Sequence, residues 1–561
     1  TLIVGSAALA TYLSWLLAER LGGHANVRAI TIYRFALDLA QRSGLRADHV
    51  LTDEARLRLG ERVVASVTAS PESSFGSLRG MPGLVPAFLR SIEDLREARV
   101  PADRPWDGCG ERVADVRRAL IAYEAALHEA DAADRAGVYA RAARALRART
   151  PHGSISERGT LVENDGDVLA LPAVAFVYGL YDLPECQREL LAVLAGVCET
   201  TVFLPSPQDG QGYTASGWRF FAELGLRANA LPATALAAAE LVSVGDDEGE
   251  LIEVARALRR SAGEGRRFHE IAVVAPSEQR ADHLARGLRT LGFPVARRLP
   301  PSSGGCVSLG SLLEAAFPDA GEAWQRAALL AYAQGMAAAG VLRGDEVARW
   351  ADESRQAGVV AGDDWRRLRH HHHQLTARLG DLRAEVEDGG SEGGEGRAAV
   401  LRRRRAAVDA LIAFVDRVQQ AVADLPAVAP WDQMAAAFVR LAHEVCAVPP
   451  DDPAVAAITE LRRCAAVEEA VSVAEAARVI GERLRGVREP CGAVARCGVA
   501  VLTPHELRGL RFAEVHFTGL CSGGFPPSRG GDPLLCDRER ERLARRFAVH
   551  LAEPGGGESE A

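Results

Sequence analysis

The sequence predicts an α/β protein with two α/β cores, each interrupted by a long helical segment. Near the start, short apolar runs at 2–4 and 27–32 alternate with helix-like stretches at 7–21 and 33–41. Strand patterns return later, at 173–183, 199–207, from 241 to about 299, and at 499. Between them, residues 51–150 and 312–490 show helical spacing almost throughout. A chain of 561 residues is too long for one core, so we expect two to four domains.

The composition excludes some classes of protein and leaves others open. No apolar run reaches the roughly 18 residues that a membrane span needs, and the first residues lack the pattern of a signal peptide. We therefore expect a cytoplasmic protein with no membrane partner. The net charge of −9 does not indicate a surface that is basic throughout. It does not exclude a basic groove that binds nucleic acid, because the charge of a groove is local and the net charge is a property of the whole chain.

The chain contains no lysine, so all 66 basic residues are arginine. A phosphate-binding loop of the form G-x-x-x-x-G-K-[ST] therefore cannot be written in it, because the lysine amine binds the β- and γ-phosphates. Schiff-base chemistry and the usual lysine of a PD-(D/E)xK nuclease site are excluded for the same reason.

Cysteine and histidine give no clear metal site. None of the ten cysteines forms a C-x2-C pair, so core or surface thiols are favoured over zinc ligands. The run His370–His373 allows a metal site or a solvated helix face, and we favour the face. The run Arg402–Arg405 allows a phosphate patch or a solvated face, and again we favour the face. The glycine-rich stretch 387–397 predicts a flexible loop.

Four stretches together resemble a known family, the superfamily 1 DNA helicases of the UvrD/RecB type, and most closely the AddB-like helicase-nuclease subunits. They are "VRAITIYRFALDLA", "YEAALHEADAADRAGVYARAARAL", "DDEGELIEVARALRR" with "HEIAVVAPSEQRADHLARGLRTLGFPV", and "TPHELRGLRFAEVHFTGLCSGGFPP". The last stretch carries the most specific match. Together the four span nearly the whole chain.

The resemblance implies two RecA-like cores of the P-loop NTPase type, each with a mainly helical insertion. It places the first core at 1–56 and 157–240 around an insertion at 57–156. It places the second core at 241–310 and 491–561, truncated, around an insertion at 311–490.

The resemblance also implies site residues. Contacts to DNA are expected from two groups of side chains: Thr31, Tyr33 and Arg34, and Thr503, His505 and Arg508. Contacts to nucleotide are expected from Arg280, Gly509 and Arg511. From the residues alone, helix caps at Thr31 and Thr503 and a turn residue at His505 are favoured over DNA contact; with the resemblance, the two explanations are equally supported.

The chain departs from the family at the positions that serve ATP. The phosphate-binding strand and loop are expected to precede Thr1. Where active members carry a carboxylate pair for Mg²⁺, this chain reads "VYGLYDL", with Asp182 displaced and Glu185 the next acidic residue. Arg511 stands where the family has a glutamate. The chain ends in "EPGGGESEA" before an arginine-bearing ATP motif and before any nuclease domain, so we expect a partial chain.

These features predict a DNA-binding, helicase-like subunit or fragment of an AddB-type helicase-nuclease that processes double-strand breaks for recombinational repair. Its expected partners are single-stranded or end-bearing double-stranded DNA and a second helicase-nuclease subunit, in the cytoplasm at the nucleoid. ATP and Mg²⁺ are implied by the family alone. Two alternatives stay open: the middle portion of an active ATP-dependent 3′ to 5′ helicase, and a scaffold without catalysis.

Overall fold

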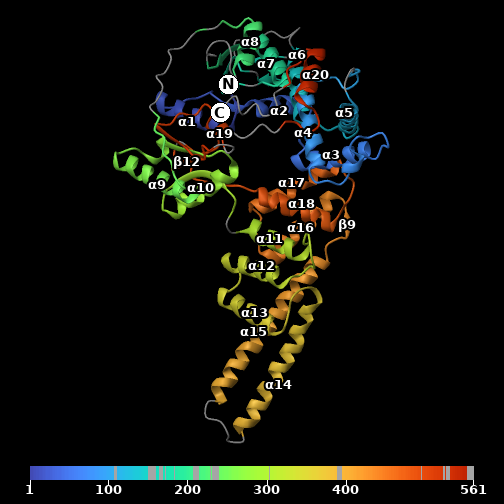
Figure 1. The fold of residues 1–561 in the computed structure, drawn as a ribbon, viewed down its shortest axis with the longest axis vertical. Coiled ribbons are helices and arrows are strands. Elements are labelled where there is room, and N and C mark those ends of the chain that lie inside the picture. The colour runs from blue at the N-terminus through green and yellow to red at the C-terminus, as the bar shows by residue number, and fades with distance from the viewer. Residues whose placement is uncertain are drawn as a thin grey trace. The chain divides into compact units, whose positions relative to one another are not determined.

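The chain forms two compact units (Figure 1). The first unit joins Thr1–Arg298 to Pro490–Ala561, and the second comprises Leu299–Glu489. This computed structural model describes residues 1–551 except for 107–109, 150–159, 163–167, 171, 182, 206–213, 228, 230–238, 302–303, 388–393, 495, 522–524 and 526–530.

The first unit contains a parallel sheet with the strand order β2-β1-β5-β6. Its strands are β1 (Leu2–Val4), β2 (Ala29–Thr31), β5 (Val174–Tyr178) and β6 (Glu199–Phe203). Leu2 and Val4 of β1 pack with helix α1 (Ala7–Leu21) on one face. Ile3 points to the other face, where α2 (Ile32–Arg42), α6 (Arg135–Arg149) and α7 (Glu185–Val197) cover the sheet. Side chains alternate between faces along a strand, which explains this division.

A second sheet in the same unit has the order β11-β8-β12-β7-β13. Its strands are β7 (Ile271–Val274), β8 (Val295–Leu299), β11 (Glu489–Cys491), β12 (Val499–Leu502) and β13 (Glu514–Phe517). Strands β12 and β13 both run parallel to β7, one on each side of it. The two strands predicted near 499–517 are therefore separated by β7, and the short helix α19 (Pro504–Leu507) follows the first of them. The structure thus has two parallel α/β sheets, as the sequence predicts at this coarser level.

The remaining helices of the first unit lie around these sheets (Figure 1). They are α3 (Asp53–Thr68), α4 (Leu84–Glu97), α5 (Glu111–Glu129), α8 (Ala215–Glu223), α9 (Asp247–Gly263), α10 (Glu278–Thr290) and α20 (Asp537–Phe547). A short antiparallel pair, β3 (Thr160–Val162) and β4 (Val168–Ala170), completes the unit. Of the predicted helical segment, α6 packs into the hydrophobic core beside the first sheet through Val138, Tyr139 and Leu146.

The second unit is almost entirely helical. It contains α11 (Gly305–Ala316), α12 (Arg326–Ala338), α13 (Gly344–Gln356), α14 (Arg367–Glu387), α15 (Gly394–Ala423), α16 (Trp431–Cys446), α17 (Pro453–Glu460), α18 (Val473–Gly486) and the two-residue strands β9 (Val428–Ala429) and β10 (Val471–Ser472). Helices α14 and α15 form a long projecting pair (Figure 1). The unit begins at Leu299, earlier than the expected boundary at 311.

Several expectations are wrong in detail. Residues 241–244 are exposed and form no strand. A loop was expected over 387–397, but both ends of this glycine-rich stretch are helical. Glu387 is the last residue of α14, and residues 394–397 form the start of α15. Residues 388–393 lie outside the described residues.

The two charged runs are also less solvated than expected. His371 is buried and bonds to Glu353 with 2.8 Å between Nε2 and Oε2. Arg404 donates to both oxygens of the same carboxylate, at 2.6 and 2.9 Å. Packing of α13, α14 and α15 against one another turns part of each run inward. In the described part of the chain, no helix is long and apolar enough to span a bilayer.

Candidate nucleic-acid and nucleotide sites

The first predicted DNA-contacting group follows β2. Thr31 is the N-cap of α2, and its Oγ1 accepts a hydrogen bond from the Arg34 backbone N–H at 3.2 Å. The Arg34 side chain is 60% exposed and pairs with Asp38 one turn later, at 3.0 Å. Asp38 also pairs with Arg28 at 2.6 Å. One carboxylate shared by two arginines leaves a net positive charge at this turn.

Tyr33 is placed differently from its neighbours. Its ring lies edge-on to Tyr139, with 6.0 Å between centroids, and the Arg135 guanidinium lies 5.8 Å from its centroid. The ring packs against the core of the first sheet. Tyr33 is therefore part of the packing beside the first sheet, and its contact with a base stays a prediction.

The second predicted group follows β12. Thr503 is buried and forms a capping box, in which its backbone N–H and its hydroxyl both donate to the Glu506 carboxylate, at 2.8 and 3.1 Å. The same carboxylate pairs with the buried Arg297 at 3.3 Å. The Thr503 hydroxyl is therefore committed to local structure.

His505 and Arg508 lie on the exposed side of this turn. His505 is exposed and Arg508 is half-buried. Partial burial, and then the positive charge of Arg508, lower the pKa of His505 below its ordinary value of 6.5. His505 is therefore neutral at neutral pH and offers hydrogen bonds rather than charge.

Arg280, predicted to contact nucleotide, lies in the first turn of α10. Its guanidinium pairs with Glu250 at 2.7 Å and with Asp247, both on α9. The second Glu250 oxygen accepts from the Gly519 backbone N–H at 2.7 Å. The charge of Arg280 is thus balanced by carboxylates of α9. Through Glu250, Arg280 links α10 to α9 and to the turn after β13.

Gly509 and Arg511, the other two predicted nucleotide residues, lie together against the first sheet. The Tyr178 hydroxyl, at the end of β5, donates to the Gly509 carbonyl at 3.2 Å. Burial raises the pKa of Tyr12 of α1, and the nearby Arg511 backbone opposes this shift. Leu510 and Phe512 pack on the cluster formed by Leu2, Val4, Leu9 and Tyr12.

The crevice in which a doubly wound sheet binds phosphate lies outside the carboxyl ends of its strands, where the strand order reverses. In the first sheet this point is at β1, which has β2 on one side and β5 on the other. Only Gly5 and Ser6 connect β1 to α1, and Ser6 Oγ caps the helix by accepting from the Leu9 N–H at 3.1 Å. A connection of this length has no room for the glycine-rich loop that encloses a triphosphate.

Close backbone packing fills the same crevice. A Cβ added to Gly5 would lie 2.5 Å from the Gly179 carbonyl oxygen. Gly179 has φ +74°, and a Cβ there would lie 2.6 Å from Leu9 Cδ2. These glycines let β1, β5 and α1 approach one another, so the space for phosphate is occupied by protein atoms.

Carboxylates for Mg²⁺ do not gather there either. β5 ends in Tyr178, Glu185 lies in the first turn of α7, and Asp182 lies outside the described residues. Among the residues that the structure describes, no three histidine, cysteine or acidic side chains could hold a metal ion together. The residues present do not fit Mg²⁺ and ATP at the first sheet.

The structure therefore brings together two of the three nucleotide candidates, but against an apolar surface. The residues that form this surface, Leu9, Tyr12 and Tyr178, were not expected from the sequence to act at a site. In the sequence, Leu9 and Tyr12 look like any core-facing residues of a helix, so nothing marks them as part of a site. Tyr178 could have been noticed, because it stands at a strand end where a carboxylate was expected.

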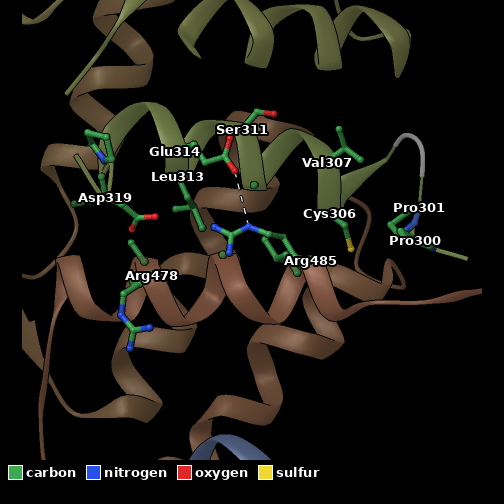
Figure 2. A pocket seen from close by; sticks show the side chains of 16 residues that line it. Pro300, Pro301, Cys306, Val307, Ser311, Leu313, Glu314, Asp319, Arg478 and Arg485 are labelled. Atoms are coloured by element: carbon green, nitrogen blue, oxygen red, sulfur yellow. Dashed lines mark ion pairs between the residues drawn. The ribbon is translucent and has the colours of Figure 1, made fainter. Parts of the chain in front are cut away.

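A separate cavity of about 480 Å³ lies in the second unit between α11 and α18 (Figure 2). Glu314 and Arg485 face each other across it at 3.9 Å. Cys306 lies at one end, where burial raises the pKa of its thiol to about 12 and keeps it protonated. None of the sequence-predicted site residues lines this cavity.

The chain matches no known protein-family model and no curated protein.

Proposed function

We propose that this chain is a DNA-binding, helicase-like subunit or fragment of the AddB type, which acts in the processing of double-strand breaks without hydrolysing ATP itself. The order of elements supports two RecA-like cores, because each parallel sheet belongs to a segment that resembles one. Any ATP hydrolysis would come from a phosphate-binding loop that precedes Thr1 or from a partner subunit.

One observation carries the DNA-binding part of the proposal. A threonine-capped turn follows a strand in each sheet, and each turn carries arginine close to the cap: Arg34 after β2 and Arg508 after β12. Arginine and backbone N–H groups at such turns suit phosphate oxygens. Arg34 is exposed although it pairs with Asp38, so a phosphate could replace water around it.

The competing function is a scaffold without DNA contact. The Arg34–Asp38 pair and the capping box of Thr503 support it, because both satisfy polar groups without any ligand. The residues around β1 do not fit ATP and residues 1–561 contain no lysine, so the alternative of an active helicase requires a phosphate-binding loop outside these residues.

The test is binding of the full chain to fluorescently labelled single-stranded DNA, and to a duplex with an end, across a salt series. We expect affinity to fall as salt rises, since each phosphate contact releases counterions. Replacing Arg34 and Arg508 with alanine should weaken binding and lower the salt slope by about one for each phosphate that is no longer bound.

A matched control is Arg349→Ala. Arg349 is 57% exposed and pairs with Asp345 at 2.8 Å across one helical turn, as Arg34 does with Asp38, but it lies on α13. Loss of affinity in the Arg34 and Arg508 variants but not in Arg349→Ala supports the proposal. Binding that is absent, or that all three variants leave unchanged, supports the scaffold.

A further inference from the structure

A joint of side chains from both sheets lies at the crevice described above. On the first sheet its members are Leu9, Tyr12 and Tyr178, and on the second they are the residues of the turn 509–512. A hydrogen bond and an apolar cluster cross it: the Tyr178 hydroxyl donates to the Gly509 carbonyl, and Leu510 and Phe512 pack on the α1 side chains.

Gly509 shows how close this contact is. It has φ +76°, and a Cβ there would lie 3.0 Å from Leu9 Cδ2 and 3.1 Å from Tyr178 Cε1. Any other residue would meet both backbone strain and contact with the first sheet. The turn is therefore shaped to dock on the end of β5 and on α1.

A second tie joins the two parts of this unit. Asp532, which follows the second sheet in the chain, accepts from the buried Ser91 hydroxyl of α4 at 2.9 Å. Arg540 of α20 is also buried and pairs with Asp532 at 3.1 Å and with Asp94 of α4 at 2.9 Å. Burial of this network makes its separation costly, because each charge would lose its partner.

We infer that the two sheets of this unit form one fixed body, held by the joint at the β1–β5 crevice and by the Asp532–Arg540 tie, and that the joint occupies the position at which a motor of this fold would bind nucleotide. This inference deepens the proposed function, since a fixed body can hold DNA but cannot step along it. It does not require DNA binding, so the two can fail separately.

Hydrogen exchange of the full chain, followed by mass spectrometry, tests the inference. We compare peptides that cover 5–12 and 507–513, with and without Mg²⁺ and ATP. We expect both peptides to be protected and unchanged by nucleotide. Gly509→Ala should speed exchange in both peptides roughly tenfold, because the side chain forces the two surfaces apart.

Gly519→Ala is the matched control. Gly519 has φ +70°, and a Cβ there would lie 2.9 Å from Pro276 Cγ, which belongs to the second core itself. It should disturb the second sheet locally and leave the 5–12 peptide unchanged. Tyr178→Phe is a milder second variant, which keeps the ring and removes the hydrogen bond to Gly509, so a folding failure of Gly509→Ala does not end the test.

Faster exchange on both sides of the joint in Gly509→Ala or Tyr178→Phe, with no effect of nucleotide, supports the inference. It is overturned if Mg²⁺ and ATP change exchange in either peptide, or if both joint variants leave the 5–12 peptide as protected as in the natural chain. Since none of these measurements uses DNA, their outcome is independent of the DNA-binding test.

Discussion

Arg297 is a buried arginine with several polar partners. It lies on β8, pairs with Asp282 of α10 at 2.7 Å and with Glu506 at 3.3 Å, and donates to the Val501 carbonyl at 3.1 Å. Burial alone would lower the pKa of Arg297, but its hydrogen bond to Asp282 and the nearby carboxylates raise it above its ordinary value. Through Glu506, this arginine also positions the cap of Thr503.

Arg297→Met should therefore destabilise the second sheet by about 3 kcal/mol, because the buried carboxylate of Asp282 loses its arginine. The measurement is the urea midpoint of the full chain, followed by exchange in peptides from β7 and β12. The neighbouring Arg298 is exposed, so Arg298→Met should shift the midpoint little. Equal shifts in both variants would show that the network is not stabilising.

His505 gives a pH test at the same turn. Its pKa lies below the ordinary 6.5, so it is neutral at neutral pH and gains a proton only below that value. A bound phosphate would favour the charged form. Under the proposed function, DNA affinity should therefore rise as the pH falls through this range, and His505→Gln should remove that part of the rise. An identical pH profile in both proteins would place His505 outside the DNA contact.

Sequence reasoning succeeded at individual elements where the local pattern decides the structure. The β1 strand and α1 helix have the predicted limits, and Thr31 and Thr503 are caps, in line with one of their two explanations. It failed at 241–244, because a strand needs a partner edge that periodicity does not supply. It could not find the Tyr178–Gly509 contact, whose residues are 331 positions apart and belong to different sheets.

The charged runs on α14 and α15 show the same limit. Glu353 of α13 binds His371 of α14 and Arg404 of α15, so one carboxylate ties three helices. Burial alone would raise the Glu353 pKa, but the hydrogen bonds to Arg404 and His371 outweigh it and lower the pKa. Residues that look like a solvated face from their own helix are turned inward by neighbouring helices.

Glu353→Gln should consequently reduce the stability of the second unit at neutral pH by roughly 2 to 4 kcal/mol, since Arg404 loses its partner. A carboxyl group with a lowered folded pKa stabilises above its unfolded value, and this stability is lost as the pH falls through the folded value. The difference between Glu353→Gln and the natural chain should thus shrink in acid.

The measurement is loss of helical circular dichroism in urea at neutral and acid pH. Asp352→Asn is the control, because Asp352 is the adjacent residue on α13 but is 66% exposed and pairs across one turn with Arg355. A Glu353→Gln effect that is the same at both pH values, or no larger than that of Asp352→Asn, would contradict the prediction.

At the scale of the whole molecule, the second unit is an insertion into the second sheet. It begins as β8 ends and finishes as β11 begins, and these strands are neighbours. A Cβ on Gly492, just after β11, would lie 2.5 Å from the carbonyl oxygen of Val295, the first residue of β8. The end of β11 thus lies beside the start of β8, so the points where the chain leaves and re-enters the sheet are also adjacent.

Neighbouring strands lie about 4.8 Å apart, so a short glycine-serine linker can join β8 to β11 in place of the second unit. We expect this shortened chain to fold, because the hydrophobic clusters around Ile3, Leu9 and Ala500, the joint at Gly509 and the Asp532–Arg540 tie consist of residues outside 299–489. The measurements are monodispersity on gel filtration and the exchange protection of 5–12 and 507–513, compared with the full chain. Aggregation, or loss of protection in both peptides, would show that the sheets depend on the helical unit for their stability. If the shortened chain folds and also keeps the salt-dependent DNA affinity of the full chain, the phosphate contacts belong to the two sheets, as the positions of Arg34 and Arg508 predict.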